Sequence, residues 1–500
     1  MTLSSAQRGL WALDQLAPGS AFYNVPLAYR LRGPLDAGRL SAAVERVAGR
    51  HEVLRTSIVS VEGAPEGIVR PASDFRLGFS DLCDLPEGRR EAEALRRALE
   101  TARRAFDLER DVPFRAELVR LTPADHVLVL TWHHTAADER SARLVVREIV
   151  AGYSEGLDAL RRPAVQYGDV ALRGEASLHG EELDVLLAYW RKTLRDAPAS
   201  ISLPTDRPAP PVPSFKGAVV EVPLPPDLVA GLEAIANARA TDLDVTLLAG
   251  FEVLLHRYTS QDDLVLGRAV DGRTDETAAV VGTFVNVLPL RVDAAGNPAF
   301  GGLVERVRDR MEELEHHRGI PFERLVEELH PRRGSGGAPS FQVVFAVEET
   351  ADEPPSLGDV TVEEMPLEAA TARFDLLLTI AHGRDGVAAY FEFATDLFDA
   401  ATVRRLARHW VNLLRAAAAA PERRIGGLDL MDSRELEEVV GLGATPGGAA
   451  RPPVHVTIAG QAEVRPDAPA VVSGEVTISY AGLMARSGAV AAELQRRGVR

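Results

Sequence analysis

Two adjacent histidines and a nearby aspartate are the residues of this 500-residue chain best placed to do chemistry. His133 and His134 follow a short apolar run, residues 127–130, which predicts a buried strand. Asp138 comes four residues after His134, and from Ala142 onward the apolar residues follow a helical period. The histidines therefore lie in a turn between a strand and a helix, where catalytic groups are commonly held by rigid elements.

The chemistry of this turn depends on the imidazoles. Histidine titrates near neutral pH, so a base here would activate an amine or hydroxyl nucleophile. Asp138 would either orient an imidazole or hold the turn through an arginine. The competing interpretation is structural, because a pair of histidines taken alone is more often packed core or turn than catalytic. A metal site is disfavoured, since two adjacent histidines and one aspartate match known ligand sets poorly.

The elements around this turn predict a mixed α/β chain. Apolar spacing predicts helices over residues 36–50, 181–194 and 400–414, and strands over residues 264–267, 341–347, 374–381 and 387–394. Asp385-Gly386 predicts a hairpin between the last two strands. The five prolines of residues 204–217 predict an extended connector, and two α/β halves joined in this way suggest a site at their interface. Residues 441–453, rich in glycine and proline, predict a second linker.

Composition excludes several classes of protein. The 56 basic and 73 acidic side chains give a net charge of −17, which repels a nucleic-acid backbone. No apolar run approaches the ~18–20 residues of a membrane span, and the first residues lack a signal-peptide pattern. Cys83 is the single cysteine, which excludes an internal disulfide. We therefore expect a cytoplasmic protein that binds neither nucleic acid nor membrane.

The segment HHTAADERS (133–141) resembles the HHxxxDG signature of nonribosomal peptide synthetase condensation domains, which belong to the chloramphenicol-acetyltransferase-like superfamily. Further segments resemble condensation-domain signatures in the same order along the chain: LSSAQRGLWALDQL (3–16), RHEVLRTSI (50–58), VQYGDVA (165–171), SQDDLVLGRAVDGRT (260–274), VGTFVNVLPLR (281–291), HHRGIPFERLVEEL (316–329), APSFQVVFAVE (338–348), FDLLLTIA (374–381) and FEFATDLFDAATV (391–403). The resemblance covers residues 3–440, and residues 466–500 resemble the start of an adenylation domain.

This resemblance implies a fold and a division of the chain. The fold is mixed α/β, with two chloramphenicol-acetyltransferase-like lobes in a V-shaped pseudodimer and the active site in a tunnel at their interface. The implied parts are an N-terminal lobe (1–175), a C-terminal lobe (176–435), a linker (436–455) and a truncated adenylation fragment (456–500).

The resemblance also implies an activity. Condensation domains join a donor aminoacyl or peptidyl thioester to the α-amine of an acceptor aminoacyl thioester. Both substrates are carried on the 4'-phosphopantetheine of partner carrier proteins, one upstream and one downstream, and the chain itself binds no cofactor. An adenylation domain in cis and a monomeric state are also expected. Residues 23–26 and the opening motif favour the class with an L-configured donor.

The same resemblance assigns roles residue by residue. His134 is the catalytic residue, as base or as positioner of the amine, and no metal is expected. His133 and Asp138 support the motif, with Arg55 or Arg291 as the arginine that pairs with Asp138. Phe284, Val285 and Asn286 lie on the loop between the lobes.

Glu139 departs from the condensation-domain pattern, which has glycine at this position. Its side chain either points away, or engages a basic or unusual acceptor, or obstructs the acceptor channel, and in the last two cases it modulates that channel. The third interpretation implies a catalytically silent interface domain that recruits carrier proteins or a tailoring enzyme, as X domains of glycopeptide synthetases recruit oxygenases. Because His134 and Asp138 are both present, retained activity is the favoured prediction.

Overall fold

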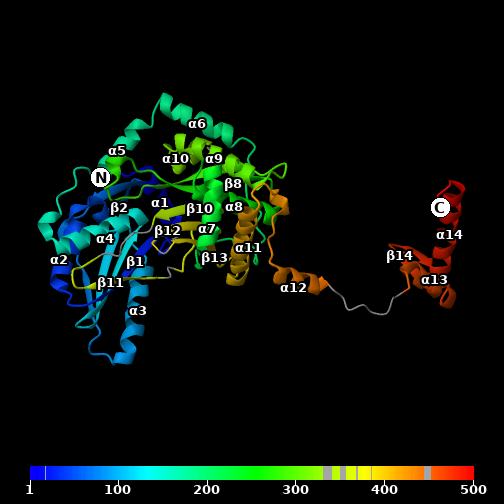
Figure 1. Ribbon diagram of the computed structural model, residues 1–500, viewed down its shortest axis with the longest axis horizontal. Helices are drawn as coiled ribbons and strands as arrows, with labels where there is room; N and C mark the ends of the chain where they lie inside the picture. Colours follow the sequence, from blue (N-terminus) through cyan, green and yellow to red (C-terminus); the bar gives the residue numbers. More distant parts are fainter. Residues whose placement is uncertain are drawn as a thin grey trace. The chain divides into compact units, whose positions relative to one another are not determined.

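The computed structural model describes residues 1–16, 18–329, 341–349, 356–367, 370–384, 386–443 and 452–499. The chain divides into two compact units, Met1–Leu430 and Met431–Arg500, which are described separately (Figure 1). The first unit contains two lobes, each built on one sheet. We call them the N-terminal lobe and the C-terminal lobe.

The N-terminal lobe is a five-stranded sheet with helices packed against it. Its strand order is β11 (Thr361–Met365), β1 (Asn24–Arg32), β6 (Asp125–His133), β5 (Phe114–Thr122), β4 (Gly78–Asp81). The hairpin β2 (Thr56–Val61) and β3 (Ala64–Val69) stands beside it. The helices of this part of the chain are α1 (Ser5–Leu16), α2 (Ala37–Arg50), α3 (Glu87–Arg103), α4 (Glu139–Ser154) and α5 (Tyr167–Ser177).

The C-terminal lobe is a six-stranded mixed sheet. Its strand order is β7 (Gly217–Pro223), β13 (Gly386–Ala394), β12 (Leu376–Gly383), β10 (Val343–Glu349), β8 (Asp263–Asp271), β9 (Val285–Asp293). Its helices are α6 (Glu181–Thr193), α7 (Pro226–Ala238), α8 (Leu243–Thr259), α9 (Phe300–His316), α10 (Phe322–Leu329) and α11 (Ala400–Ala419).

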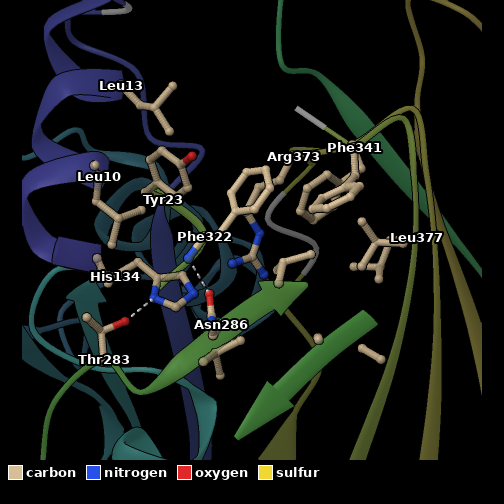
Figure 2. Close-up of a pocket in the computed structure, with 18 of the residues that line it drawn as sticks. Leu10, Leu13, Tyr23, His134, Thr283, Asn286, Phe322, Phe341, Arg373 and Leu377 are labelled. Carbon is tan, nitrogen blue, oxygen red and sulfur yellow. Dashed lines mark hydrogen bonds between the residues drawn. The ribbon is translucent and has the colours of Figure 1, made fainter. Parts of the chain in front are cut away.

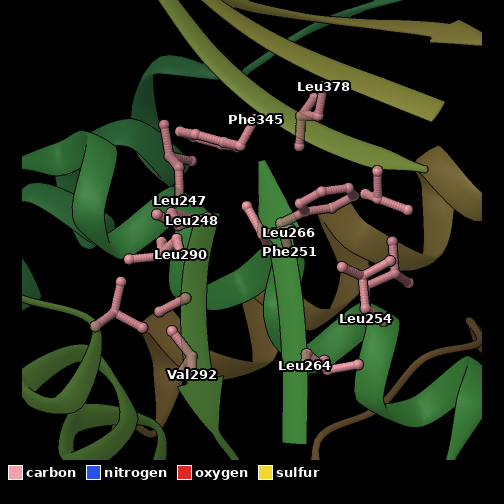
Figure 3. Close-up of a cluster of buried hydrophobic side chains, with 14 of the residues drawn as sticks. Leu247, Leu248, Phe251, Leu254, Leu264, Leu266, Leu290, Val292, Phe345 and Leu378 are labelled. Atoms are coloured by element: carbon pink, nitrogen blue, oxygen red, sulfur yellow. The ribbon is translucent and has the colours of Figure 1, made fainter. Parts of the chain in front are cut away.

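Apolar patterning explains why these elements form. In α2 the predicted stripe of Leu40, Ala43, Val44 and Val47 is fully buried, and the Asp36 side chain caps the helix by accepting from the backbone N–H of Arg39. Helix α8 is apolar on all sides and is buried from Val245 to Leu255. Figure 3 shows side chains of α8 beside those of strands β8, β9, β10 and β12, so the helix packs against this sheet in the C-terminal hydrophobic core.

Two segments of the C-terminal half cross into the N-terminal lobe. Strand β11 pairs antiparallel with β1, so Val362 lies opposite Leu31. The residues between β8 and β9 place Val280 and Val281 in the hydrophobic core of the N-terminal lobe. These crossings tie the two lobes together, and the second one reaches the turn that carries the two histidines.

The second unit contains α12 (Ser433–Gly443), α13 (Val454–Val464), the hairpin β14 (Pro469–Ser473) and β15 (Val476–Ser479), and α14 (Tyr480–Arg496). The predicted linker 441–453 is therefore helical up to Gly443, while residues 444–451 lie outside the described part of the chain. Asp385 of the predicted hairpin turn and residues 338–340 of one matched segment also lie outside it. No helix in the described ranges is both long and apolar enough to cross a bilayer.

Candidate active site

The two histidines lie where the sequence predicts them, at the end of a buried strand. His133 is the last residue of β6, and Asp138 is the N-cap of α4, with its carboxylate accepting from the Ser141 backbone N–H at 2.8 Å. The backbone N–H of His134 donates to the Tyr23 carbonyl at 2.8 Å. Strand β6, strand β1 and helix α4 therefore fix the backbone of this turn.

The carboxylate of Asp138 is completely buried and holds the two lobes together. It forms a bidentate ion pair with Arg273, with both N···O distances 2.9 Å, and it accepts from the Phe284 backbone N–H at 2.8 Å. Ser141 adds two hydrogen bonds between the lobes. Its hydroxyl donates to the Gly282 carbonyl and accepts from the Gly282 N–H. Arg273, Gly282 and Phe284 all lie on the crossing segment between β8 and β9.

The prediction that Arg55 or Arg291 pairs with Asp138 is therefore wrong. Arg55 donates to the carbonyls of Gly49 and Arg70 instead. Arg291 pairs with Asp263, on the neighbouring strand of its own sheet. The actual partner, Arg273, falls within the matched segment 260–274, but no local pattern marks it, since its pairing depends on the crossing of the lobes.

The loop assignment of residues 284–286 also needs correction. Val285 and Asn286 are the first residues of strand β9, and only Phe284 precedes it. The Phe284 ring lies 4.2 Å from the Arg273 guanidinium, a cation–π contact that supports the buried ion pair. Asn286 accepts from the Phe322 N–H and donates to the Ile320 carbonyl, so it joins β9 to the start of α10.

The two imidazoles have different surroundings. His133 is buried, and its Nδ1 lies 2.9 Å from the Thr135 hydroxyl. Burial lowers the pKa of His133 to about 3, so this ring is neutral at physiological pH. Its environment is that of a packed structural residue.

His134 instead faces a cavity. Its Nδ1 lies 3.2 Å from the Thr283 hydroxyl, and among the described residues Nε2 makes no hydrogen bond (Figure 2). Burial, and then the charge of Arg373, lower the pKa of His134 below its usual value of 6.5, although Glu139 and Asp138 oppose this shift. A neutral imidazole with a free Nε2 in a cavity has the chemistry of a base or a hydrogen-bond acceptor.

The cavity lies between the lobes and has a volume of about 1580 Å³. One wall is apolar and includes Leu10 and Leu13 of α1, together with Tyr23, Val285 of β9 and Phe322 of α10. Figure 2 shows Arg373 and Leu377, which belong to the C-terminal lobe, among the residues that line the cavity with His134. The space is large enough for two tethered acyl groups, since small-molecule sites commonly have volumes of about 300–1,000 Å³.

Glu139 lines this cavity. Its Oε1 lies 3.4 Å from the guanidinium of Arg373, which comes from the other lobe. The ion pair with Arg373 lowers the pKa of Glu139 in spite of its burial, so the side chain is charged. The interpretation in which Glu139 points away is therefore wrong. Within the described ranges, no group of His, Cys, Asp and Glu side chains is arranged to hold a metal ion.

Comparison with known proteins identifies the family. A family model described as "Condensation domain" matches residues 1–440. One of the linear gramicidin synthase proteins of Brevibacillus parabrevis is 38% identical over 507 residues, an alignment that covers 99% of this chain and 6% of the relative. The chain belongs to the condensation-domain family. Members of this family are amide-bond-forming acyltransferases of nonribosomal peptide synthetases, and this chain spans only a small part of the relative's length.

Solved condensation domains have the same fold. The first condensation domain of the calcium-dependent antibiotic synthetase, in complex with a substrate analogue, aligns with a TM-score of 0.70 at 25% identity, over 86% of this chain and 99% of that one. The X-domain from teicoplanin biosynthesis aligns with a TM-score of 0.77 at 28% identity, over 86% and 97%. These alignments confirm the predicted mixed α/β fold of two acetyltransferase-like lobes.

A longer structure aligns with both units of the condensation-domain chain. It is a four-domain nonribosomal peptide synthetase bound to AMP and glycine, with a TM-score of 0.78 at 23% identity. The alignment covers 99% of this chain and 39% of that one.

Proposed function

We propose that this condensation domain forms a peptide bond between two acyl groups held on carrier proteins. The acceptor α-amine attacks the carbonyl carbon of the donor thioester, the C–N bond forms, and the C–S bond breaks to release the donor carrier thiol. The observation that carries this proposal is the Nε2 of a neutral His134, which lies in a cavity lined by both lobes and makes no hydrogen bond to the described part of the chain.

His134 acts on the attacking amine. For Nε2 to accept a proton, Nδ1 must carry the hydrogen and donate it to the Thr283 hydroxyl, which lies 3.2 Å away. Nε2 then accepts a hydrogen bond from the amine, directs its lone pair at the carbonyl, and takes the amine proton as the C–N bond forms. That proton finally neutralises the departing thiolate.

The substrates and partners follow from this reaction. Phosphopantetheine arms of an upstream donor carrier and a downstream acceptor carrier bring the acyl groups into the cavity, and the chain itself contributes no cofactor. We assign residues 1–175 and 176–435 to the two lobes, 436–455 to a linker, and 456–500 to the start of an adenylation domain in cis. We place this protein in the cytoplasm as a monomer with an L-configured donor, as part of antibiotic or other secondary metabolism.

A silent interface domain is the second candidate, favoured by the similarity to X-domains, one of which is solved as a complex with OxyB. Two observations argue against a silent domain: His134 lines the cavity, and the Asp138–Arg273 ion pair holds the turn that carries His134. The test mixes the chain with loaded donor and acceptor carriers. Dipeptidyl product on the acceptor carrier supports condensation, while tight carrier binding with no product supports the silent domain.

Replacement of Thr283 with valine tests how His134 is oriented. Valine keeps the shape of threonine but removes the hydroxyl partner of Nδ1, so the imidazole loses the contact that selects the tautomer with a free Nε2. We expect the single-turnover rate of condensation to fall about 10–100-fold, less than the about 10²–10⁴-fold help of a general base, because the imidazole itself remains. Thr283→Ser, which retains the hydroxyl, restores most of the rate. Equal rates for valine and threonine would contradict this role.

The pH dependence of the rate tests the protonation state of His134. Only the neutral ring accepts a proton, and the pKa of His134 lies below 6.5 in the folded protein. As the pH is lowered from 7, the rate of the bound complex should therefore begin to fall only at a pH below 6.5. Arg373→Gln removes a cation that disfavours the imidazolium, and we expect it to move this acid limb to higher pH. Rapid-quench rates with saturating carriers measure the profile. An acid limb unmoved by Arg373→Gln would contradict the assignment.

A further inference from the structure

The ion pair between Glu139 and Arg373 depends on a residue at which this chain departs from the condensation-domain pattern. A glycine, which the condensation-domain pattern has at residue 139, offers no side chain to reach Arg373. Here the pair spans the two lobes inside the cavity that His134 lines. Glu139 therefore adds a negative charge to the cavity, and it pairs with an arginine that would otherwise be available to other carboxylates.

Two further carboxylates belong to the surroundings of this ion pair. Glu392 accepts from the Arg373 backbone N–H at 3.3 Å. Glu348 lines the cavity, and among the described residues its side chain forms no hydrogen bond or ion pair. The other nearby cation, Arg143, is already paired with a glutamate of β11 at 3.8 Å. Around this ion pair the described residues thus include more carboxylates than cations, and of Glu139, Glu348 and Glu392 only Glu348 has no hydrogen bond or ion pair there.

An enclosed carboxylate without a partner is unfavourable. Burial, and then the charge of Glu139, raise the pKa of Glu348 to about 7, and burial also raises the pKa of Glu392. A cation that entered this part of the cavity would balance the charge and favour the ionised form of both side chains. Because Glu139 occupies Arg373 and Arg143 is paired with β11, neither of these two cations of the described chain balances Glu348.

We propose that Glu139, Glu348 and Arg373 form a subsite for the cationic side chain of a carrier-tethered basic aminoacyl group, of the alkylammonium type found in ornithine. In this subsite Glu348 binds the ammonium, and Glu139 holds Arg373 away from Glu348. The inference rests on the proposed function, in which tethered acyl groups enter this cavity. The α-amine is common to all aminoacyl groups, so the side-chain charge is what the subsite recognises.

The test compares two unreactive probes by isothermal titration of the whole chain. The probes are pantetheine amides of ornithine and of norleucine, whose side chains have the same length but end in an ammonium or a methyl group. We expect the ornithyl probe to bind about tenfold more tightly or better, as a charge-assisted contact allows. Glu348→Gln and Glu139→Gly should each reduce the preference to about threefold or less. Glu363→Gln, an exposed change on β11, should leave it intact.

Equal affinities of the two probes, or no binding of the ornithyl probe, overturn the subsite. Because the amides cannot react, this result is independent of catalysis: absence of dipeptide product with a retained ornithyl preference overturns the proposed function alone. Condensation assays then place ornithine either on the donor carrier or on the acceptor carrier. The substrate that delivers the side chain is the one whose condensation rate falls in Glu348→Gln.

Discussion

Replacement of His134 with alanine is expected to lower the single-turnover rate of dipeptide formation by at least about 10²–10⁴-fold, the contribution of a general base, with a further loss if the imidazole also positions the amine. The ring is buried but faces the cavity, so its removal takes away Nε2 together with the contact between Nδ1 and the Thr283 hydroxyl. Affinities for the two carrier proteins should not change, since the imidazole is buried inside the cavity.

A matched histidine provides the control. His316 is exposed near the end of α9 and is absent from the cavity lining, so His316→Ala should keep the wild-type rate. Rapid-quench mass spectrometry of the acceptor carrier measures all three proteins. A His134→Ala variant that retains a rate within about threefold of wild type would show that the imidazole is structural.

Replacement of Arg273 with alanine is expected to give the largest loss of stability, about 3–5 kcal/mol, as is typical when one partner of a buried ion pair is removed. Arg273 and Asp138 are 3% and 0% exposed, so the remaining carboxylate has no access to water. The same change frees the segment that carries Gly282 and Phe284, and activity should fall together with stability.

An exposed ion pair provides the control for this experiment. Arg32→Ala removes a partner of Glu363 on the surface, where both side chains are more than half exposed, and should cost no more than about 1 kcal/mol. Urea unfolding followed by tryptophan fluorescence measures both variants, because Trp11, Trp132, Trp190 and Trp410 all lie in the unit Met1–Leu430. Similar losses of stability for Arg273→Ala and Arg32→Ala would contradict the role of the Asp138–Arg273 ion pair in holding the lobes together.

Local patterns in the sequence predict much of the fold. The stripe of α2, the apolar run of β6 and the strands β12 and β13 all form close to the predicted ranges, since each depends on burial of one local face. The sequence patterns do not predict strand β11. It pairs with β1 across more than 300 residues, and nothing in its own five residues, TVEEM, specifies that partner.

The residues of the candidate site likewise fall into those that the sequence predicts and those that it does not. His133, His134 and Asp138 follow one another in the chain, so their motif is visible in the sequence. Arg273 and Thr283 reach them only because the segment between β8 and β9 crosses to the other lobe, and a connection between strands carries no periodic signal for such a crossing. Arg55 and Arg291 lie in equally recognisable motifs, but each is satisfied within its own lobe.

The account depends most directly on whether an acyl group moves from one carrier to the other at His134. The intact mass of the acceptor carrier, measured after one turnover with loaded donor and acceptor carriers, tests this. We predict that the acceptor carrier gains the mass of the donor acyl group with the wild-type chain, while the donor carrier returns to its free thiol, and that neither change occurs with His134→Ala. An acceptor carrier whose mass is unchanged by the wild-type chain, or changes equally with both proteins, would contradict the account.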